Sequence, residues 1–263
     1  MLQLNDSEVA WEFLRRNLAY QQDASRHEPV PSQPQTLESG QKVWRDRQHA
    51  PAALRWGLPR FVEPALRAPD APIDWNEAFG AARIDALVRL PASGERPDLH
   101  LADLRCVSHI VITPDGAETL LINTSERALM LRLCGQTTLN GPVCLTFQIA
   151  GLRALPAAGL SLLSLPDLLA SRPRTLDRSR RRLLLRDALV ALDGRTAGAS
   201  YREIAAVIAG AERAQAAWKS SDHSLKDRMR RALKAGLALC NGRYRLLIGP
   251  MPVRALTDMP PDR

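Results

Sequence analysis

Side chains that carry redox, metal or catalytic chemistry are few and scattered in this sequence of 263 residues. Its four cysteines lack the paired spacing of zinc sites and redox motifs, so we expect them to be reduced and structural. Its five histidines neither pair with one another nor stand at ligand spacing with a cysteine. We expect His109, which lies in a β-branched stretch, to be a core or edge residue rather than a ligand. The sequence therefore predicts no bound metal and no cofactor.

Recognisable catalytic motifs are missing as well. The chain has no G-x-x-x-x-G-K-[ST] phosphate loop, no G-x-S-x-G nucleophile turn and no H-E-x-x-H zinc helix. Acidic pairs suited to glycosidic or phosphoryl chemistry do not occur in any stretch predicted to be structured. These absences make an enzyme the least favoured class, and we expect no catalytic residues.

Long apolar runs are also absent. No segment approaches the roughly 20 apolar residues that a membrane helix requires. Residues 1–10 have neither the basic head nor the apolar core of an export signal. We therefore expect a cytoplasmic, nucleoid-associated protein without a membrane partner.

Positive charge, in contrast, is plentiful and unevenly distributed. The formal net charge is +8, yet residues 171–263 contain 20 Lys or Arg against 9 Asp or Glu, a balance of +11, which leaves residues 1–170 at −3. The C-terminal part therefore carries the electric field that attracts polyanions. A DNA-facing C-terminal domain attached to a near-neutral regulatory part explains this asymmetry better than solubility alone.

The pattern of residues 199–240 predicts two helices joined by a turn. Ser200 and Glu203 have the spacing of a capping box, which predicts a helix start, and Gly210 predicts the end of that helix. A polar connection then leads to a second helix over residues 224–240. A short capped helix, a turn and an amphipathic helix with a cationic outer face are typical of a helix-turn-helix.

The second of these helices is predicted to have an apolar face and a cationic face. The expected core stripe recurs every four residues at Leu225, Met229, Leu233 and Leu237, with Ala232 and Gly236 beside it. Cations recur at the same interval at Lys226, Arg230 and Lys234, with Arg231 beside them. A run of Lys and Arg on a helix is often only a solvated face. The arginine-rich segment upstream favours DNA contact instead, with Arg231 as a candidate base contact.

The remaining elements are predicted from periodicity and turn signals. Helices are expected over residues 7–20, 78–90 and 176–193, with two short helices within 152–170. Strands are expected over residues 106–112 and 118–123, which form a hairpin, over 128–133 and 143–149, and over 243–248, which could act as a wing. Residues 59–97 are otherwise expected to be loop and linker. Three tryptophans in the first 60 residues are expected to pin irregular chain onto a domain.

Together these elements predict an α+β fold. Residues 1–170 are expected to form an N-terminal regulatory region with a Trp-rich segment, loops and a small antiparallel sheet. Residues 171–250 are expected to form a helical helix-turn-helix DNA-binding domain that carries the short wing, and residues 251–263 a flexible tail.

Short motifs at both ends of the chain resemble a known family. Residues 10–17 (AWEFLRRN), followed by Tyr20, resemble the opening motif of a proteobacterial regulator family, except that Leu18 stands where typical members have Pro. Residues 199–205 (ASYREIA) and 225–231 (LKDRMRR) resemble its C-terminal domain. Together they are similar to the FseA-type excision activators of rhizobial integrative and conjugative elements. The resemblance implies a transcriptional activator of excision or transfer genes, while small single-domain relatives act as antiactivators that bind protein rather than DNA.

The leading hypothesis is a DNA-binding transcriptional regulator whose partner is double-stranded DNA. Its expected DNA contacts are Lys226, Arg228, Arg230, Arg231 and Lys234 on the second helix and Arg243 and Arg245 on the wing. RNA polymerase and a regulatory protein are further expected partners. The alternative is an antiactivator-like interaction module that regulates another transcription factor without binding DNA. An RNA binder lacks support, because the aromatic and basic sheet signature for single strands is missing.

Overall fold

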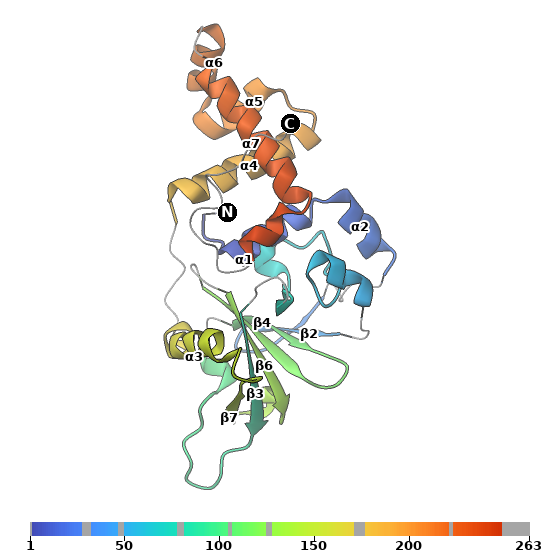
Figure 1. The fold of residues 1–263 in the computed structure, drawn as a ribbon, viewed down its shortest axis with the longest axis vertical. Coiled ribbons are helices and arrows are strands. Elements are labelled where there is room, and N and C mark those ends of the chain that lie inside the picture. The colour runs from blue at the N-terminus through green and yellow to red at the C-terminus, as the bar shows by residue number, and fades with distance from the viewer. Residues whose placement is uncertain are drawn as a thin grey trace.

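The computed structural model describes residues 2–27, 33–46, 50–77, 82–104, 107–124, 128–170, 177–220 and 223–248. The fold is α+β, as predicted. A β-sheet occupies one end of the molecule, and helices α5 (Tyr201–Ala209) and α6 (Ala211–Lys219) lie at the other end (Figure 1). Helices α1 (Asp6–Leu14) and α4 (Arg180–Thr196) lie between them.

Within the described residues, seven strands form one sheet in the order β1-β2-β4-β5-β6-β3-β7. Their bounds are β1 Gln35–Thr36, β2 Lys42–Arg45, β3 Arg83–Arg89, β4 Val107–Ile112, β5 Glu118–Asn123, β6 Ala128–Gly135 and β7 Cys144–Gln148. The predicted hairpin is confirmed as β4 and β5, and the next two predicted strands are β6 and β7. The sheet is larger than predicted and mixed, because β2 runs parallel to β4 and β3 runs parallel to β6.

Strand β3 replaces a predicted helix. Residues 78–81 of that prediction lie outside the described residues, but Arg83–Arg89 is extended and lies between β6 and β7. Ile84, Ala86 and Val88 alternate towards the core, which is the period of a strand rather than of a helix. The short apolar stretch is compatible with a helix and with a strand. Backbone pairing with β6 and β7 selects the strand.

One continuous helix covers the sheet where two short helices were predicted. Helix α3 (Leu155–Leu169) runs through Pro166 without ending. Proline lacks the amide that would bond one turn back, so the helix loses a hydrogen bond there. Leu162, Leu165 and Leu169 pack against the core of the sheet on both sides of Pro166, and this contact supports the helix across the gap.

The predicted N-terminal helix is two helices. The N-cap of α1 is Asn5 rather than the expected Ser7: the Asn5 side chain accepts from the Glu8 amide, and Glu8 accepts from the Asn5 amide. Helix α1 ends at Leu14, and Asn17 caps a second helix, α2 (Leu18–Ser25). Asn17 begins the second helix because its side chain accepts from the Tyr20 amide, which is otherwise free in the first turn.

Helix α1 belongs to a core that spans residues from both ends of the chain. Trp11 and Tyr20 are fully buried, with Leu189 from α4 in the same cluster. Helix α7 (Ser224–Cys240) and the 3₁₀-helix η6 (Arg243–Leu247) also contact α1. The predicted domain boundary near residue 170 stays a prediction, but the N-terminal helices and the C-terminal helices are packed together.

The expected wing has a different structure. Residues 243–247 form the 3₁₀-helix η6 instead of a strand, and Tyr244 is fully buried. The Tyr244 hydroxyl donates a hydrogen bond of 2.9 Å to the carbonyl of Trp56. Tyr244 and Leu247 pack on the N-terminal core and the segment is helical, so it does not form the strand of a wing.

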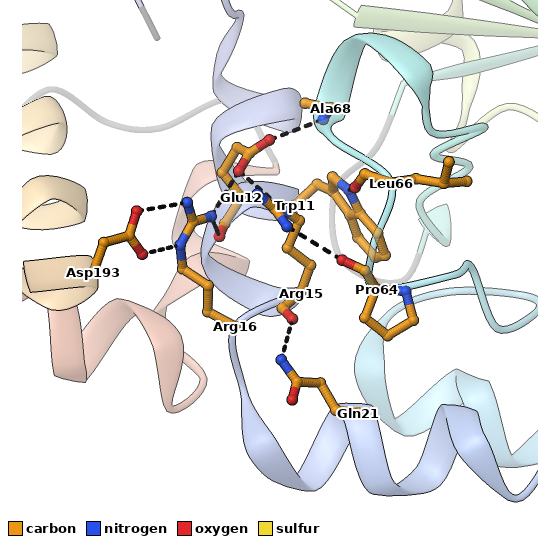
Figure 2. A network of polar contacts seen from close by, with 9 residues as sticks. All are labelled: Trp11, Glu12, Arg15, Arg16, Gln21, Pro64, Leu66, Ala68 and Asp193. Atoms are coloured by element: carbon orange, nitrogen blue, oxygen red, sulfur yellow. Dashed lines mark hydrogen bonds and ion pairs between the residues drawn. The ribbon is translucent and has the colours of Figure 1, made fainter. Parts of the chain in front are cut away.

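A polar network also ties α1 to α4 (Figure 2). The Arg16 guanidinium donates to Asp193 of α4 at 2.5 and 2.8 Å and to the Glu12 carboxylate at 2.6 Å. Glu12 also accepts from the Ala68 amide and from Arg15. Burial alone would raise the pKa of Glu12, but these hydrogen bonds outweigh it and the pKa is lowered. Glu12 therefore stays charged and helps to hold the two helices in one arrangement.

Candidate DNA-binding surface

Helix α4 is the support on which the C-terminal helices pack. It begins after Ser179, whose side chain accepts from the Arg182 amide, and it passes the predicted end at Gly194 to reach Thr196. A Cβ at Gly194 would lie 2.7 Å from the Ile204 side chain, so the absence of a side chain lets α5 pack closely on α4. The glycine serves close helix packing here rather than termination.

Helix α5 has the predicted start and end. The Glu203 carboxylate accepts from the Ser200 amide at 2.7 Å, and the Ser200 hydroxyl accepts from the Glu203 amide at 3.3 Å. Hydrogen bonds from the amide and hydroxyl of Ser200 lower the pKa of Glu203. Gly210 ends the helix with φ of +95°, a conformation that other residues rarely adopt. Ile204 faces the local core.

The predicted polar connection after Gly210 is a third helix, α6. It begins at the residue that follows Gly210, so α5 and α6 are joined by a single-residue turn. Ala214 is buried, and Ala217 and Trp218 pack partly against the same core as α5. The alanines at intervals of three indicate this helix, but the polar residues between them are typical of a connection.

Helix α7 has the predicted bounds, and its buried face agrees with the prediction except towards the C-terminal end. The buried residues are Leu225, Met229, Ala232, Gly236, Leu239 and Cys240. Leu233 is only partly buried and Leu237 is 45% exposed, so the predicted stripe is wrong at its C-terminal end. A step of four residues overshoots the 3.6-residue turn, so a stripe at that interval rotates away from the core. A Cβ at Gly236 would lie 2.6 Å from the Ala188 carbonyl oxygen, which shows how closely α7 approaches α4.

Four predicted contact residues lie together on α7. Arg230, Arg231 and Lys234 are exposed and Lys226 is half-buried. Arg230 lies 3.2 Å from the Asp227 carboxylate, and the Lys226 ammonium lies 5.6 Å from the ring centre of Trp218. Among the described residues, Lys234 has no ion-pair partner. These cations are held by weak local contacts and are available to an external anion.

The other three predicted contact residues have different surroundings. Arg228 donates to the buried Asp187 of α4 at 2.6 Å, and Arg186 binds the same carboxylate at 2.7 Å. Arg228 therefore has a structural role in joining α7 to α4. Arg243 and Arg245 are exposed on η6, beyond the C-terminal end of α7, and Arg245 donates to the Arg55 carbonyl. They do not form a group with Lys226 and Arg230 in the N-terminal half of α7.

The outer face of α6 was missed from the sequence. Its exposed residues are Ala211, Glu212, Arg213, Gln215, Ala216 and Lys219. Within the described part of the chain, Arg213 and Gln215 make no side-chain hydrogen bond or ion pair. Figure 1 places α6 at the tip of the molecule, away from the sheet. Polar side chains without internal partners on such a helix are suited to reading an external surface.

A metal site and a membrane span are both absent from the described residues. No group of three or more His, Cys, Asp or Glu side chains there could hold a metal ion, and no helix is long and apolar enough to cross a membrane. The prediction for His109 is confirmed: it is buried, accepts from the Trp44 indole at 3.0 Å, and lies 3.1 Å from the Pro69 carbonyl.

A helical unit with exposed cations on one helix and free polar groups on another is typical of nucleic-acid-binding proteins. Residues 158–248 match a family described as "T6SS, Transcription factor, DNA binding domain". Residues 1–61 match a family described as "Proteobacterial transcriptional regulator-like domain". A search among curated proteins gives no match. Both descriptions concern transcriptional regulation, and the one that matches residues 158–248 also concerns DNA binding.

Proposed function

We propose that this protein activates transcription by binding double-stranded DNA through α6 and α7, and that its targets include genes for mobile-element excision or transfer. The observation that carries DNA binding is the exposed cationic group on α7, Lys226, Arg230, Arg231 and Lys234, inside the segment that matches a DNA-binding domain family. The more specific target genes rest on the resemblance to FseA-type activators alone. Regulation through a protein partner and contact with RNA polymerase belong to the same proposal.

In this proposal α5 and α6 form a helix-turn-helix and α7 flanks it. The second helix of such a pair enters the major groove with its N-terminal residues towards base edges. Arg213 and Gln215 lie in the first half of α6, and both residue types form paired hydrogen bonds with bases. The cations of α7 then bind the neighbouring phosphates, since the Lys226–Trp218 contact holds the start of α7 beside the end of α6.

Replacing Arg230 and Lys234 together with alanine is expected to flatten the salt dependence of DNA binding. Each phosphate contact contributes a slope of about −0.9 in log affinity against log salt, so the loss of two contacts should reduce the slope by up to about two units. The measurement is a fluorescence-anisotropy titration of duplex DNA at several salt concentrations. The matched control is Arg45→Ala with Arg89→Ala, which removes the same charge from exposed positions on the sheet. Equal slopes for both double variants would remove α7 from the interface.

Replacing Arg213 or Gln215 with alanine is expected to relax sequence preference. Loss of one paired base contact should reduce discrimination between cognate and altered sites by about 1–3 kcal/mol. The measurement compares the affinity of each variant for a selected binding site and for random duplexes of equal length. Arg230→Ala is the contrasting variant, because a phosphate contact should weaken both kinds of DNA alike. An equal loss on both DNAs for Arg213→Ala and Gln215→Ala would contradict base reading by α6.

The antiactivator-like alternative predicts a different result in the same titrations. A module that binds only another regulator should show no salt-dependent affinity for any duplex. Wild-type protein without such affinity for genomic DNA fragments would favour that alternative over DNA binding.

A further inference from the structure

Helix α3 has an apolar outer face that the described chain leaves uncovered. Its inner face, with Leu162, Leu165 and Leu169, packs on the sheet. Its outer face carries Leu160 at 71% exposure and Leu163 at 79% exposure, and Leu152 and Leu155 are exposed at its N-terminal end. A surface helix normally has polar residues on its outer side, whereas a helix that is apolar all round is covered on all sides. The outer leucines therefore mark a binding surface.

The charges beside these leucines indicate what covers them. Leu160 and Asp167 are seven residues apart and follow one line along α3, with Leu163 next to it. Arg153 lies in the turn two residues before the helix begins. Arg153 and Asp167 are both exposed and lie at opposite ends of this leucine surface. No other charged residue lies between 153 and 167. One end of the surface is thus positive, the other negative, and the centre is leucine.

We propose that this surface binds the same surface of a second copy of the chain, with the two α3 helices antiparallel. A two-fold axis at Leu160 places Leu160 against its own counterpart, because a two-fold interface is self-complementary. Arg153 lies just before the start of α3 and Asp167 near its end, so antiparallel pairing brings Arg153 of each copy towards Asp167 of the other. Each copy then contributes one Arg and one Asp, so the pairing is neutral and places opposite charges together at both ends. Charge complementarity therefore favours a second copy with this orientation.

Dimerisation through α3 goes beyond the proposed DNA binding. The α5–α6 tip lies at the far end of the molecule from the sheet on which α3 packs (Figure 1). A two-fold dimer would hold two such tips in one particle, and paired tips suit a DNA site with two related halves. The dimer itself is tested without DNA, so its failure is distinct from failure of DNA binding.

The first test measures mass by sedimentation over a range of concentrations. Wild type is expected to show a reversible monomer–dimer equilibrium. Leu160→Glu places two carboxylates at the axis and should raise the dimer Kd at least about 100-fold, since an unpaired charge is costly in an apolar interface. Leu18→Glu is the matched control, because Leu18 on α2 has the same 71% exposure. Circular dichroism checks that both variants fold. A wild type that is monomeric throughout, or a mass that Leu160→Glu leaves unchanged, would overturn the proposal.

The second test examines orientation by exchanging charges. Arg153→Asp and Asp167→Arg should each raise the dimer Kd by up to about tenfold, since each substitution places two like charges together at both ends of the interface. The double variant Arg153→Asp/Asp167→Arg restores both pairs and should recover the wild-type Kd. A mixture of the two single variants should form heterodimers for the same reason. Single variants that dimerise as well as wild type would contradict the antiparallel pairing, because parallel helices place each residue against its own counterpart.

Discussion

Trp11→Ala is expected to lower the free energy of unfolding by about 3–5 kcal/mol, because it removes a large buried aromatic side chain and leaves a cavity. Trp11 is fully buried and lies edge-on to Tyr20, with ring centres 5.7 Å apart. Its indole N–H donates to the Leu66 carbonyl at 3.0 Å. The same cluster contains Leu189 of α4, so the substitution should weaken the contact between the N-terminal and C-terminal helices. Urea denaturation followed by circular dichroism measures the loss.

Two companion variants separate the causes of that loss. Trp11→Phe keeps an aromatic ring and loses the indole donor, so its effect should be smaller than that of alanine. Leu18→Ala, at an exposed position on α2, should change stability by no more than about 0.5 kcal/mol. A Trp11→Ala effect as small as that of Leu18→Ala would show that α1 does not pack as described.

Arg60→Ala is expected to cost about 3–5 kcal/mol, since it removes the cation from a buried ion-pair group. The Arg60 side chain is 3% exposed and lies 2.7 Å from Asp74 and 3.5 Å from Asp46. Both carboxylates are largely buried and would be left near each other without this positive charge. Chemical denaturation at neutral pH measures the change.

Two further variants separate the effect of charge from that of side-chain packing. Arg60→Met keeps most of the volume but leaves the two carboxylates, so it should still be strongly destabilising. Adding Asp46→Asn and Asp74→Asn to Arg60→Met removes the unbalanced charge and should recover most of the stability. Equal stability of Arg60→Met and the triple variant would mean that side-chain packing, rather than charge, explains the effect.

The candidate DNA-binding surface was predictable only in part. The cations of α7 were found because Lys226, Arg230 and Lys234 share a helical interval that sequence alone reveals. Arg228 belongs to the same run and could not be separated from it, since its partner Asp187 lies 41 residues earlier on α4. The outer face of α6 was missed because a nine-residue helix with weak apolar signal looks like a polar connection.

Local chemistry in the sequence determined the elements that depend on neighbouring residues. The capping box of Ser200 and Glu203, the end of α5 at Gly210 and the β4–β5 hairpin each rest on bonds between residues a few positions apart. The net charge of +11 for residues 171–263 can likewise be counted without knowledge of the fold. These features were predicted because their physical cause is contained in short segments.

Tertiary structure alone decided the features that depend on distant residues. Arg83–Arg89 is a strand because β6 and β7 offer it hydrogen bonds, and residues 243–247 are helical because Tyr244 enters a core built by α1. The buried face of α7 includes Leu239 and Cys240 rather than Leu237, because the helix packs closely on α4 near Gly236. In each case the segment suits more than one structure, and the free energy of burial against a partner far away in the sequence selects one of them.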